Sequence, residues 1–534
     1  MSMMKKLPLG IQNFKEIIRD DYVYIDKTKY VYDLLTGAKC YFLSRPRRFG
    51  KSLLLDTIDV AFGGDKELFK GLWIYNSDYA FEKHPVIRLD MSNIANKTPD
   101  ILERELADEV RKRALNEGID IHSEIPSNLF KNLIEGLFKK YGQRVVVLID
   151  EYDKPILDHL TDVRTAEANR AVIKGFYGIL KSMDPFLRLT FITGVSKFTK
   201  TSIFSELNNL LDITMAKQYV NICGIEPENL ALYFNEHIAH LAPKEEFQRY
   251  EFLEDEILAW YDGYSWDGRT KVINPYSLLS FFMQESFEGF WYASGTPSFL
   301  IDLIRKKPAS FLSLHNMEIS KRGLDTFDIK KMEIAPLLFQ TGYLTVKEKR
   351  FRGDIESFLL IMPNREVREA FNLSIIADFT ENDGNLAESA YWGMKEAFQA
   401  GDLGRVRDIL KSLFAAIPYQ LHVDAEAYYH SIFYAIMNLL GFDIAAEVSV
   451  SGGRIDASLE LTDKVYVMEF KYVQCAPDAP AEEKGRLFKK ALDEGVKQIA
   501  DKGYADKYIG GGKEIIVAAF AFLGRDDIEM AVEA

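Results

Sequence analysis

The sequence predicts an α/β protein of several domains, the first of them built on a parallel sheet with helices on both faces. Its 534 residues, at about 100 to 200 residues per domain, require more than one hydrophobic core. Over the first 196 residues, apolar strand-like runs alternate with helical stretches, an order typical of parallel sheets. The runs VVVLI (145–149) and LTFI (189–192) are almost continuously apolar, as strands buried on both faces should be.

The elements of this sheet are expected in a definite order. A short strand, KCYFLS (39–44), leads through the loop RPRRFGKS (45–52) into a helix, LLLDTIDVAF (53–62). Three more strands follow, separated by helical stretches, at 85–92, 144–151 and 187–196. Each strand ends in polar residues at its carboxyl end, the edge at which open α/β sheets bind ligands.

Four further segments are expected after this sheet. The alternation stops near residue 219, and the helical stretches that follow predict a helical lid. The stretch from IAPLLFQTGYLTV onward has the order helix, strand, charged turn, strand, helix, which is the order of a winged-helix module. The expected boundaries are 1–218 for the first domain, 219–291 for the lid, 292–375 for the winged-helix-like module, 376–420 for a helical linker and 421–534 for a C-terminal α/β domain.

Composition limits the partners and the compartment. With 66 Lys plus Arg against 80 Asp plus Glu, the chain has a net charge of −14, so contact with nucleic acid must be local. The three cysteines are far apart in sequence, without a CxxC pair, which favours a reducing cytoplasm. The longest strongly apolar segment, IIVAAFAFL (515–523), is too short to span a bilayer. We therefore expect a cytoplasmic protein with no membrane attachment.

The loop between the first strand and its helix predicts a nucleotide site. It ends in Gly-Lys-Ser, as in the GxxxxGK[ST] pattern, where backbone N–H groups and a lysine surround phosphates and a hydroxyl binds Mg²⁺. A helix N-terminus with an exposed lysine is the alternative, and the preceding strand and following helix favour the nucleotide site. The expected ATP-binding residues are Arg48, Phe49, Gly50, Lys51 and Ser52.

A second motif supports this interpretation. The strand VVVLIDE (145–151) ends in two carboxylates: Asp150 would hold Mg²⁺, and Glu151 would orient or deprotonate the water that attacks the γ-phosphate. A solvated strand end is the alternative. An extra strand, at 85–92, lies between the two motifs in the sequence, as in additional-strand ATPases. The strand at 187–196 should then lie in the sheet between the two motif strands, 39–44 and 145–151. Thr193 and Ser196, at its end, are then candidates for sensing the γ-phosphate.

Two features of the loop remain open at this point. Arg45 stands where the pattern has its first glycine. An arginine finger is expected if hydrolysis is fast, and spacing cannot rank its candidates, which are Arg45, Arg47, Arg48 and Arg188.

Several sequence blocks carry a resemblance to a known family. They are YVYIDKTKYVYDLL, RPRRFGKS, IDEYDKP, FITGVSKFTKTSIFSELNNLLDIT, WYDGYSW, NPYSLLSFF, SGTPSFL and LFQTGYLTV. Together they resemble the AAA-ATPase-like proteins of bacteria, whose loop similarly lacks its first glycine, over most of the first 370 residues. The resemblance places Asp26, Lys27 and Thr28 in a DKT motif and Asp153 in IDEYDKP, with no role assigned to them.

The C-terminal domain carries a second group of charged residues. Because side chains alternate along a strand, Glu469 and Lys471 project from one face, and Asp456 on the neighbouring strand can converge on them. Asp456 and Glu469 could hold Mg²⁺, while Lys471 could position a water and stabilise charge on a phosphate. An amphipathic hairpin with solvated charges is the alternative.

This block also resembles a known family. GRID followed by EFK resembles the PD-(D/E)XK nuclease superfamily, in its version fused behind AAA-ATPase-like domains. The resemblance implies a restriction-endonuclease-like fold and a nuclease centre at Asp456, Glu469 and Lys471. It also places Gln498 on a later helix near the site, and Glu426, one helical turn before His430, as a further acidic candidate.

Charge weakens the expectation of tight DNA binding by this domain. Residues 421–534 hold 12 Lys plus Arg and 20 Asp plus Glu, so phosphate neutralisation there would be poor. DNA could instead be held by a basic wing in KEKRFRG, although a solvated hairpin turn would have the same pattern. The residues of this wing are Lys347, Lys349, Arg350 and Arg352.

Three functions are compatible with these patterns. The first is an ATP-binding and ATP-hydrolysing protein whose nucleotide state gates a Mg²⁺-dependent nuclease. We expect this nuclease to act on nucleic acid, and DNA is the expected substrate. The second is a nucleotide-dependent switch or scaffold whose nuclease-like domain binds without cutting. The third is an ATP-driven motor that works as a homo-oligomer. We expect the first, with ATP and Mg as cofactors.

Overall fold

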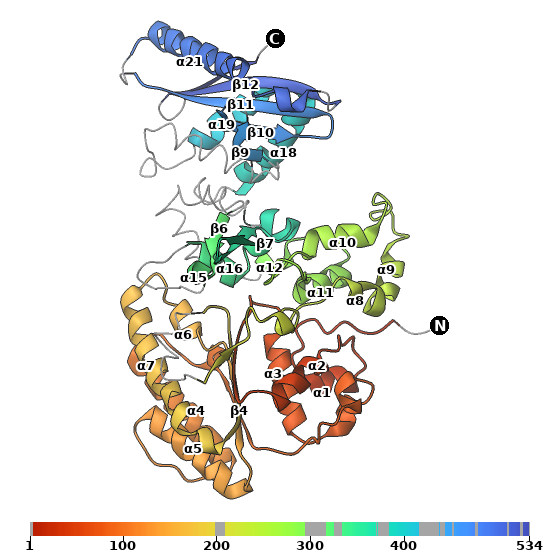
Figure 1. Cartoon of the computed structure of the whole chain (residues 1–534), viewed down its shortest axis with the longest axis vertical. Coiled ribbons are helices and arrows are strands. Elements are labelled where there is room, and N and C mark those ends of the chain that lie inside the picture. Colours follow the sequence, from red (N-terminus) through yellow and green to blue (C-terminus); the bar gives the residue numbers. More distant parts are fainter. Residues whose placement is uncertain are drawn as a thin grey trace. The chain divides into compact units, whose positions relative to one another are not determined.

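The computed structural model describes residues 4–197, 209–293, 317–324, 334–369, 371, 384–415, 437, 444–450, 453–475, 479–509, 512–523 and 527–532. The chain divides into two compact units, Met1–Gly295 with His315–Glu366, and Thr296–Leu314 with Val367–Ala534 (Figure 1). The boundaries expected after residues 375 and 420 lie outside the described residues.

A five-stranded parallel sheet forms the centre of the first unit. Its order is β2 (Val86–Asp90), β3 (Val145–Asp150), β4 (Leu187–Gly194), β1 (Cys40–Ser44) and β5 (Leu211–Asp212). Every residue of β1 and β3 is buried, which explains their continuous apolar runs. β4 lies between β1 and β3, so the strand order of an additional-strand ATPase is confirmed.

Helices cover both faces of this sheet (Figure 1). On one side α3 (Lys51–Phe62) contacts α1 (Phe14–Arg19) and α2 (Thr28–Thr36). On the other side three longer helices pack on one another: α4 (Pro99–Asn116), α5 (Pro126–Tyr141) and α7 (Val163–Ser182). The short helix α6 (Lys154–Leu157) precedes α7. The parallel sheet with covered faces agrees with the predicted fold class.

A helical region follows β5 in the same unit. Its helices are α8 (Glu228–Tyr233), α9 (Asn235–Leu241), α10 (Leu253–Tyr261), α11 (Pro275–Gln284) and α12 (Phe290–Ala293). They share an aromatic core in which Phe281 stacks on Phe287, with ring centroids 4.5 Å apart. Asn274 starts α11 because its side chain accepts hydrogen bonds from Tyr276 N and Ser277 N.

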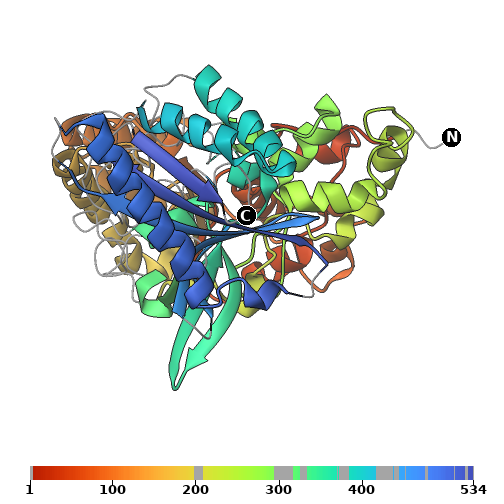
Figure 2. The ribbon, with the colours of Figure 1, turned by 90° about the horizontal axis from the view of Figure 1, so that it is seen from above.

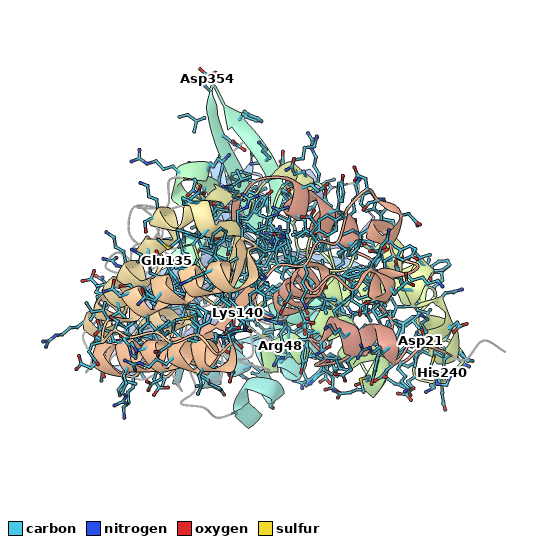
Figure 3. All side chains as sticks on the ribbon, turned by 90° about the horizontal axis from the view of Figure 1, so that it is seen from below. Asp21, Arg48, Glu135, Lys140, His240 and Asp354 are labelled. Atoms are coloured by element: carbon cyan, nitrogen blue, oxygen red, sulfur yellow. The ribbon has the colours of Figure 1, made fainter. Side chains whose placement is uncertain are left out.

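A three-stranded antiparallel sheet completes the first unit. Its order is β6 (Met317–Ser320), β8 (Ile355–Ile361) and β7 (Thr345–Arg352), accompanied by α15 (Lys321–Leu324) and α16 (Ile334–Thr341). From α16 the chain has the predicted order of helix, strand, turn, strand and helix. The β7–β8 hairpin projects from the unit, with Asp354 at its tip (Figure 3).

The second unit is a mixed five-stranded sheet with helices packed on it. The strand order is β13 (Asp527–Val532), β12 (Glu514–Leu523), β11 (Lys464–Val473), β10 (Gly453–Glu460) and β9 (Ile444–Val450), and only β11 and β12 run parallel. The long helix α21 (Ala481–Asp501) packs on β11, β12 and β13 (Figure 2). Two further helices pair with each other, α18 (Gly384–Ala400) and α19 (Leu403–Ala415).

Alternation along β11 decides which side chains reach α21. Val465 and Val467 share a core with Ile499 of α21, and Glu469 and Lys471 continue that face. Tyr466 points the other way, where its hydroxyl donates to Phe398 O of α18. After Lys464 at its start, the strand is therefore hydrophobic on both faces except at Glu469 and Lys471 near its end.

In the part of the chain that the structure describes, no helix is both long enough and apolar enough to cross a lipid bilayer.

Candidate functional sites

The loop between β1 and α3 encloses the ammonium group of Lys51. Lys51 Nζ donates to Arg45 O at 3.0 Å and to Pro46 O at 2.9 Å, and the side chain is buried. Burial lowers the pKa of Lys51, while the nearby carboxylates of Asp150 and Glu151 raise it. An ammonium group has three N–H donors, so the loop's carbonyls orient it with a donor to spare for a ligand.

The N-terminus of α3 is arranged like an anion site. Gly50 precedes the helix with φ 90°, a left-handed conformation that glycine adopts without strain. No side chain in the described residues caps the first turn of this helix. Its leading N–H groups are therefore available to an anion such as a phosphate.

Asp150, at the end of β3, collects hydroxyl groups from two other elements. Ser52 Oγ of α3 donates to Asp150 Oδ2 at 2.6 Å, and Thr193 Oγ1 of β4 donates to Asp150 Oδ1 at 2.6 Å. Glu151 N also donates to Asp150 Oδ1, at 3.0 Å. A carboxylate with two hydroxyls is a set of hard oxygen ligands of the kind that Mg²⁺ prefers. The structure thus brings together Lys51, Ser52, Asp150 and Thr193.

Glu151 adopts an unusual backbone conformation next to this cluster. Its φ of 49° is in the left-handed region, which non-glycine residues seldom occupy and which is often found at functional sites. Burial raises the pKa of its carboxyl, and the positive charge of Lys51 lowers it. The residues after Glu151 pack closely on the end of β4. A Cβ atom at Gly194 would lie 2.5 Å from the Tyr152 ring and 2.6 Å from the Asp153 carboxylate, so only glycine fits there.

Ser196 forms hydrogen bonds with Asp153 and not with Asp150. Asp153 Oδ2 accepts from Ser196 N and Ser196 Oγ, each at 2.6 Å, and from Val195 N at 3.1 Å. Both Asp153 and Ser196 are buried. The structure therefore does not bring Ser196 into the Asp150 cluster. Asp153 of the IDEYDKP block instead fastens the end of β4 to the loop after β3.

Arg45, in the place of the pattern's first glycine, directs its side chain out of the loop. Its Nη1 donates to Ser44 O and Thr214 O, each at 2.8 Å, and its Nη2 donates to Tyr219 O at 3.0 Å. The guanidinium group lies 3.9 Å from the ring centroid of Trp266 and is completely buried. Burial lowers the pKa of Arg45 to about 10. The loop tolerates the arginine because the side chain occupies this carbonyl-lined site.

The next loop residues contact the helical region. Arg48, with φ 68°, is exposed, and its guanidinium lies 4.7 Å from the ring centroid of Tyr276. Phe49 is buried, edge-on to Tyr264 at 4.8 Å and to Trp266 at 5.8 Å. These partners come from the WYDGYSW and NPYSLLSFF blocks. In the sequence, these aromatic blocks stood out only as part of the family resemblance.

The DKT motif has a structural role. Asp26 Oδ1 accepts from Thr28 N at 2.8 Å, and Asp26 Oδ2 accepts from Trp73 N at 2.6 Å. Lys27 pairs with Glu226 at 2.7 Å, just before α8. The motif begins α2 and ties it to a 3₁₀ helix (Trp73–Asn76) and to the helical region.

In the second unit, the predicted residues of β11 meet a glutamine of α21. Lys471 Nζ donates to Glu469 Oε1 and to Gln498 Oε1, each at 3.0 Å, and Gln498 Nε2 donates to Glu469 Oε1. Asp456 of β10 accepts from Phe470 N at 2.9 Å. Gly495 allows α21 this close approach, because a Cβ there would lie 2.9 Å from Ala519 Cβ. The structure brings Asp456, Glu469, Lys471 and Gln498 together.

Glu469 has two features of a metal ligand, burial and an oxygen without a hydrogen bond to any described residue. The residue is 1% exposed, and its Oε2 has no hydrogen-bond partner in the described residues. Burial and the neighbouring charge of Asp456 raise its pKa to about 7, against the opposing effect of Lys471. A cation between two carboxylates would satisfy the buried oxygen. No third acidic, His or Cys side chain joins the pair within the described residues, and Glu426 and His430 lie outside them.

Two of the four residues of the predicted basic wing pair with acidic neighbours. Arg350 forms an ion pair with Glu348 at 2.9 Å, and Lys349 pairs with Glu356 across the β7–β8 hairpin. Such pairing reduces the positive field that a phosphate backbone would meet. The geometry favours the solvated-hairpin alternative for these two residues.

Comparison with known proteins identifies the class of both units. Residues 8–204 match the family described as "Predicted AAA-ATPase", and residues 424–530 match the "PD-(D/E)XK nuclease superfamily". The chain belongs to the predicted AAA-ATPases that carry a PD-(D/E)XK nuclease superfamily domain behind the ATPase-like domain. These two domains point to an enzyme of the hydrolase type.

One relative matches almost end to end. A protein of Azotobacter chroococcum mcd 1, described as "Uncharacterized protein in vnfD 5'region", is 34% identical over 526 residues. The match covers 97% of this chain and 96% of the relative. The two proteins therefore share the whole arrangement of domains.

Proposed function

We propose that the protein binds and hydrolyses ATP in its first unit and that its nucleotide state gates cleavage of nucleic acid by its second unit. The observation that carries the first activity is the contact of Ser52 with Asp150 beside the loop-bound ammonium of Lys51. The observation that carries the second is the buried, partly unsatisfied Glu469 in contact with Lys471 and Gln498. DNA is the proposed substrate class.

In the proposed ATPase reaction each residue has one task. The N–H groups of the loop at Arg48, Phe49 and Gly50 and the ammonium of Lys51 bind phosphate oxygens. Ser52 and Asp150 hold Mg²⁺, which when bound neutralises phosphate charge. Glu151 accepts the proton of the attacking water. Thr193 holds Asp150 in place by a hydrogen bond and senses the γ-phosphate. The buried hydroxyl of Ser196 stabilises the end of β4 through its hydrogen bond to Asp153.

In the proposed nuclease reaction, Asp456 and Glu469 hold Mg²⁺, and Lys471 positions a water and stabilises charge on the phosphate. Gln498 acts as a positioning residue, because its side chain contacts both Glu469 and Lys471. We also propose a cytoplasmic location, which the three free cysteines fit. Self-association of the chain is compatible with both reactions.

A switch or scaffold without cleavage is the second candidate. It is favoured by the excess of acidic residues in 421–534 and by the ion-paired hairpin, both of which weaken attraction to phosphates. In this alternative the ATP-dependent change alters a binding surface, and Glu469 and Lys471 only stabilise the fold.

One experiment separates the two candidates. Plasmid and single-stranded DNA are incubated with Mg²⁺, with and without ATP, and with wild type, Lys51→Ala, Glu469→Ala or Lys471→Ala. Cleavage by the wild type that is lost in Glu469→Ala and Lys471→Ala supports the nuclease. Loss of the ATP effect and of phosphate release only in Lys51→Ala supports the ATPase. Equal background cleavage in all four proteins would support the switch.

A further inference from the structure

The structure distinguishes the four arginines that could stabilise charge during ATP hydrolysis by the contacts of their guanidinium groups. Arg45 is excluded because its guanidinium is buried against backbone carbonyls and Trp266. Arg188 donates to Leu35 O at 2.7 Å and lies near the start of β4. Since a strand rises about 3.3 Å per residue, Arg188 is about 16 Å from Thr193 at the other end. Neither guanidinium can reach a phosphate beside Lys51.

The two remaining arginines are neighbours with different surroundings. The Arg48 guanidinium lies over the ring of Tyr276 in α11. Arg47 is exposed, and its guanidinium makes neither a hydrogen bond nor an ion pair with any described residue. Arg47 directly follows Pro46, whose carbonyl binds the ammonium of Lys51. Of the four, Arg47 alone combines an uncommitted side chain with a position beside the phosphate-binding lysine.

The backbone of Arg47 is held firmly while its side chain is not. Its carbonyl accepts from Trp291 Nε1 at 3.1 Å, and Trp291 N in turn donates to Glu366 Oε1 at 2.6 Å. Glu366 and Trp291 are both buried. This chain of contacts fixes the point from which the Arg47 side chain extends. Burial raises the pKa of Glu151, and the positive charge of Arg47 is among the weaker effects that oppose this rise.

We propose that Arg47 is an arginine finger acting within its own chain, in contact with the oxygens of the γ-phosphate during hydrolysis; this inference rests on the proposed ATPase function. Water adds to the γ-phosphorus, and its proton passes to Glu151. The bond to the oxygen that bridges the β- and γ-phosphates breaks, and ADP leaves with the electron pair. Arg47 stabilises the charge that develops on the transferring group. The third loop residue thereby supplies, within its own chain, the cation that some P-loop NTPases take from a partner protein.

The test compares the full-length wild type with Arg47→Ala, Arg47→Lys and the control Arg144→Ala. Arg144 is an exposed arginine directly before β3, at the end of that strand opposite Asp150. Three quantities are measured: the rate of phosphate release at saturating ATP, the dissociation constant of a fluorescent ATP analogue, and retention of ADP in the presence of aluminium fluoride, which mimics the transferring phosphoryl group.

We expect Arg47→Ala to lower the turnover rate by about 10³-fold, the effect typical of an arginine finger. Its dissociation constant for the ATP analogue should change less than threefold, and its retention of ADP with aluminium fluoride should be lost. Arg47→Lys, which keeps the charge but not the fork of donors, should recover only part of the rate. Arg144→Ala should match the wild type in all three measurements.

Two outcomes overturn the proposal while leaving the ATPase intact. One is turnover by Arg47→Ala within threefold of wild type. The other is restoration of turnover when Arg47→Ala is mixed with Lys51→Ala, since each would then supply what the other lacks and the arginine would act between chains. Failure of the wild type to hydrolyse ATP, with Arg144→Ala equally inactive, would overturn the proposed function and this inference together.

Discussion

The hydroxyl of Ser52 lies 2.6 Å from Asp150 Oδ2, and this contact joins two motifs that are 98 residues apart in the chain. The contact is possible because β1 and β3 are the two neighbours of β4 in the parallel sheet. The loop after β1 and the end of β3 therefore meet at the same edge of the sheet. The contact thus places a hydroxyl and a carboxylate oxygen, both of the kind that Mg²⁺ prefers, side by side at this edge.

Glu151→Gln should separate ATP binding from ATP hydrolysis. The amide cannot accept the proton of the attacking water, so turnover should fall by about 10² to 10⁴-fold while ATP affinity stays close to that of the wild type. Because burial raises the pKa of Glu151, wild-type turnover should increase with pH as the carboxyl ionises. Phosphate release and binding of a fluorescent ATP analogue, each measured across pH, check both statements.

Glu135→Gln is the matched control for this variant. Glu135 lies on α5 and pairs with Lys131 at 3.8 Å (Figure 3). Its replacement should leave turnover and its pH dependence unchanged. Equal turnover by Glu151→Gln and Glu135→Gln would exclude Glu151 as the base.

Arg45→Gly, which restores the general loop pattern, should destabilise the protein. The variant leaves the buried carbonyls of Thr214 and Tyr219 without their charged donor and empties the space beside Trp266. Hydrogen bonds to charged groups contribute about 1.5 to 3 kcal/mol each, so a loss of about 3 kcal/mol in the free energy of unfolding is expected after the relief of arginine burial. Urea unfolding followed by tryptophan fluorescence measures this loss.

Arg48→Gly serves as the comparison on the same loop. Arg48 has φ 68°, which glycine adopts without strain, and its side chain is exposed. Its free energy of unfolding should stay within about 0.5 kcal/mol of that of the wild type, as for most surface substitutions. If Arg45→Gly were as stable as Arg48→Gly, the carbonyl site would have no part in holding the loop.

Much of this arrangement could be predicted from sequence because it depends on local pattern. Apolar runs ending in polar residues gave the strands, and Gly50-Lys51-Ser52 and Asp150 marked the edge where they meet. The distinction between Thr193 and Ser196 could not be predicted. Both hydroxyls follow the same strand, and only the fold determines that one meets Asp150 and the other meets Asp153.

The role of Arg45 was equally beyond the sequence. The side chain of Arg45 contacts residues that are 169 or more positions away in the chain, namely Thr214, Tyr219 and Trp266. Two of these contacts are with backbone carbonyls, which every residue type has, so the sequence could not mark them. In the second unit, by contrast, strand alternation alone predicted that Glu469 and Lys471 share a face. Gln498 was expected there only from the family resemblance, and its contact with both residues depends on the close approach of α21.

Gly495→Ala tests that close approach. A methyl group at this position would lie 2.9 Å from Ala519 Cβ, so α21 must move off the sheet and carry Gln498 away from Glu469 and Lys471. Overpacking of this kind costs about 1 to 3 kcal/mol. Both the melting temperature and any Mg²⁺-dependent cleavage should therefore fall.

Gly485→Ala, on the same helix, should have the opposite effect on stability. A Cβ at Gly485 meets no atom within 4 Å, and replacing a helical glycine by alanine stabilises by about 0.5 to 1 kcal/mol. Differential scanning calorimetry of the two variants gives the comparison. Similar melting temperatures for both would show that the helix tolerates a wider spacing from the sheet than the contact with Ala519 implies.

The buried carboxyl of Glu469 should make stability and metal binding depend on pH near neutrality. Its pKa is raised from the model-peptide value of 4.5 to about 7, mainly by burial, so the folded protein binds this proton more tightly than the unfolded chain does. The stabilising contribution is therefore fully present below pH 4.5 and is lost as the pH rises through 7. In EDTA, the melting temperature of the wild type should fall between pH 5 and pH 8 relative to that of Glu469→Gln, which has no proton to lose.

Mg²⁺ should reverse this trend, because it binds the ionised carboxylate and competes with the proton. Calorimetric Mg²⁺ titrations should be made in an Asp150→Asn background, which removes the other proposed cation site. Affinity should then rise from pH 6 to pH 8 and level off above the pKa, since ionisation of Glu469 is by then complete. Affinity that does not change over this range, or that is the same in Glu469→Gln, would mean that the cation is held elsewhere and that the buried oxygen of Glu469 is not its ligand.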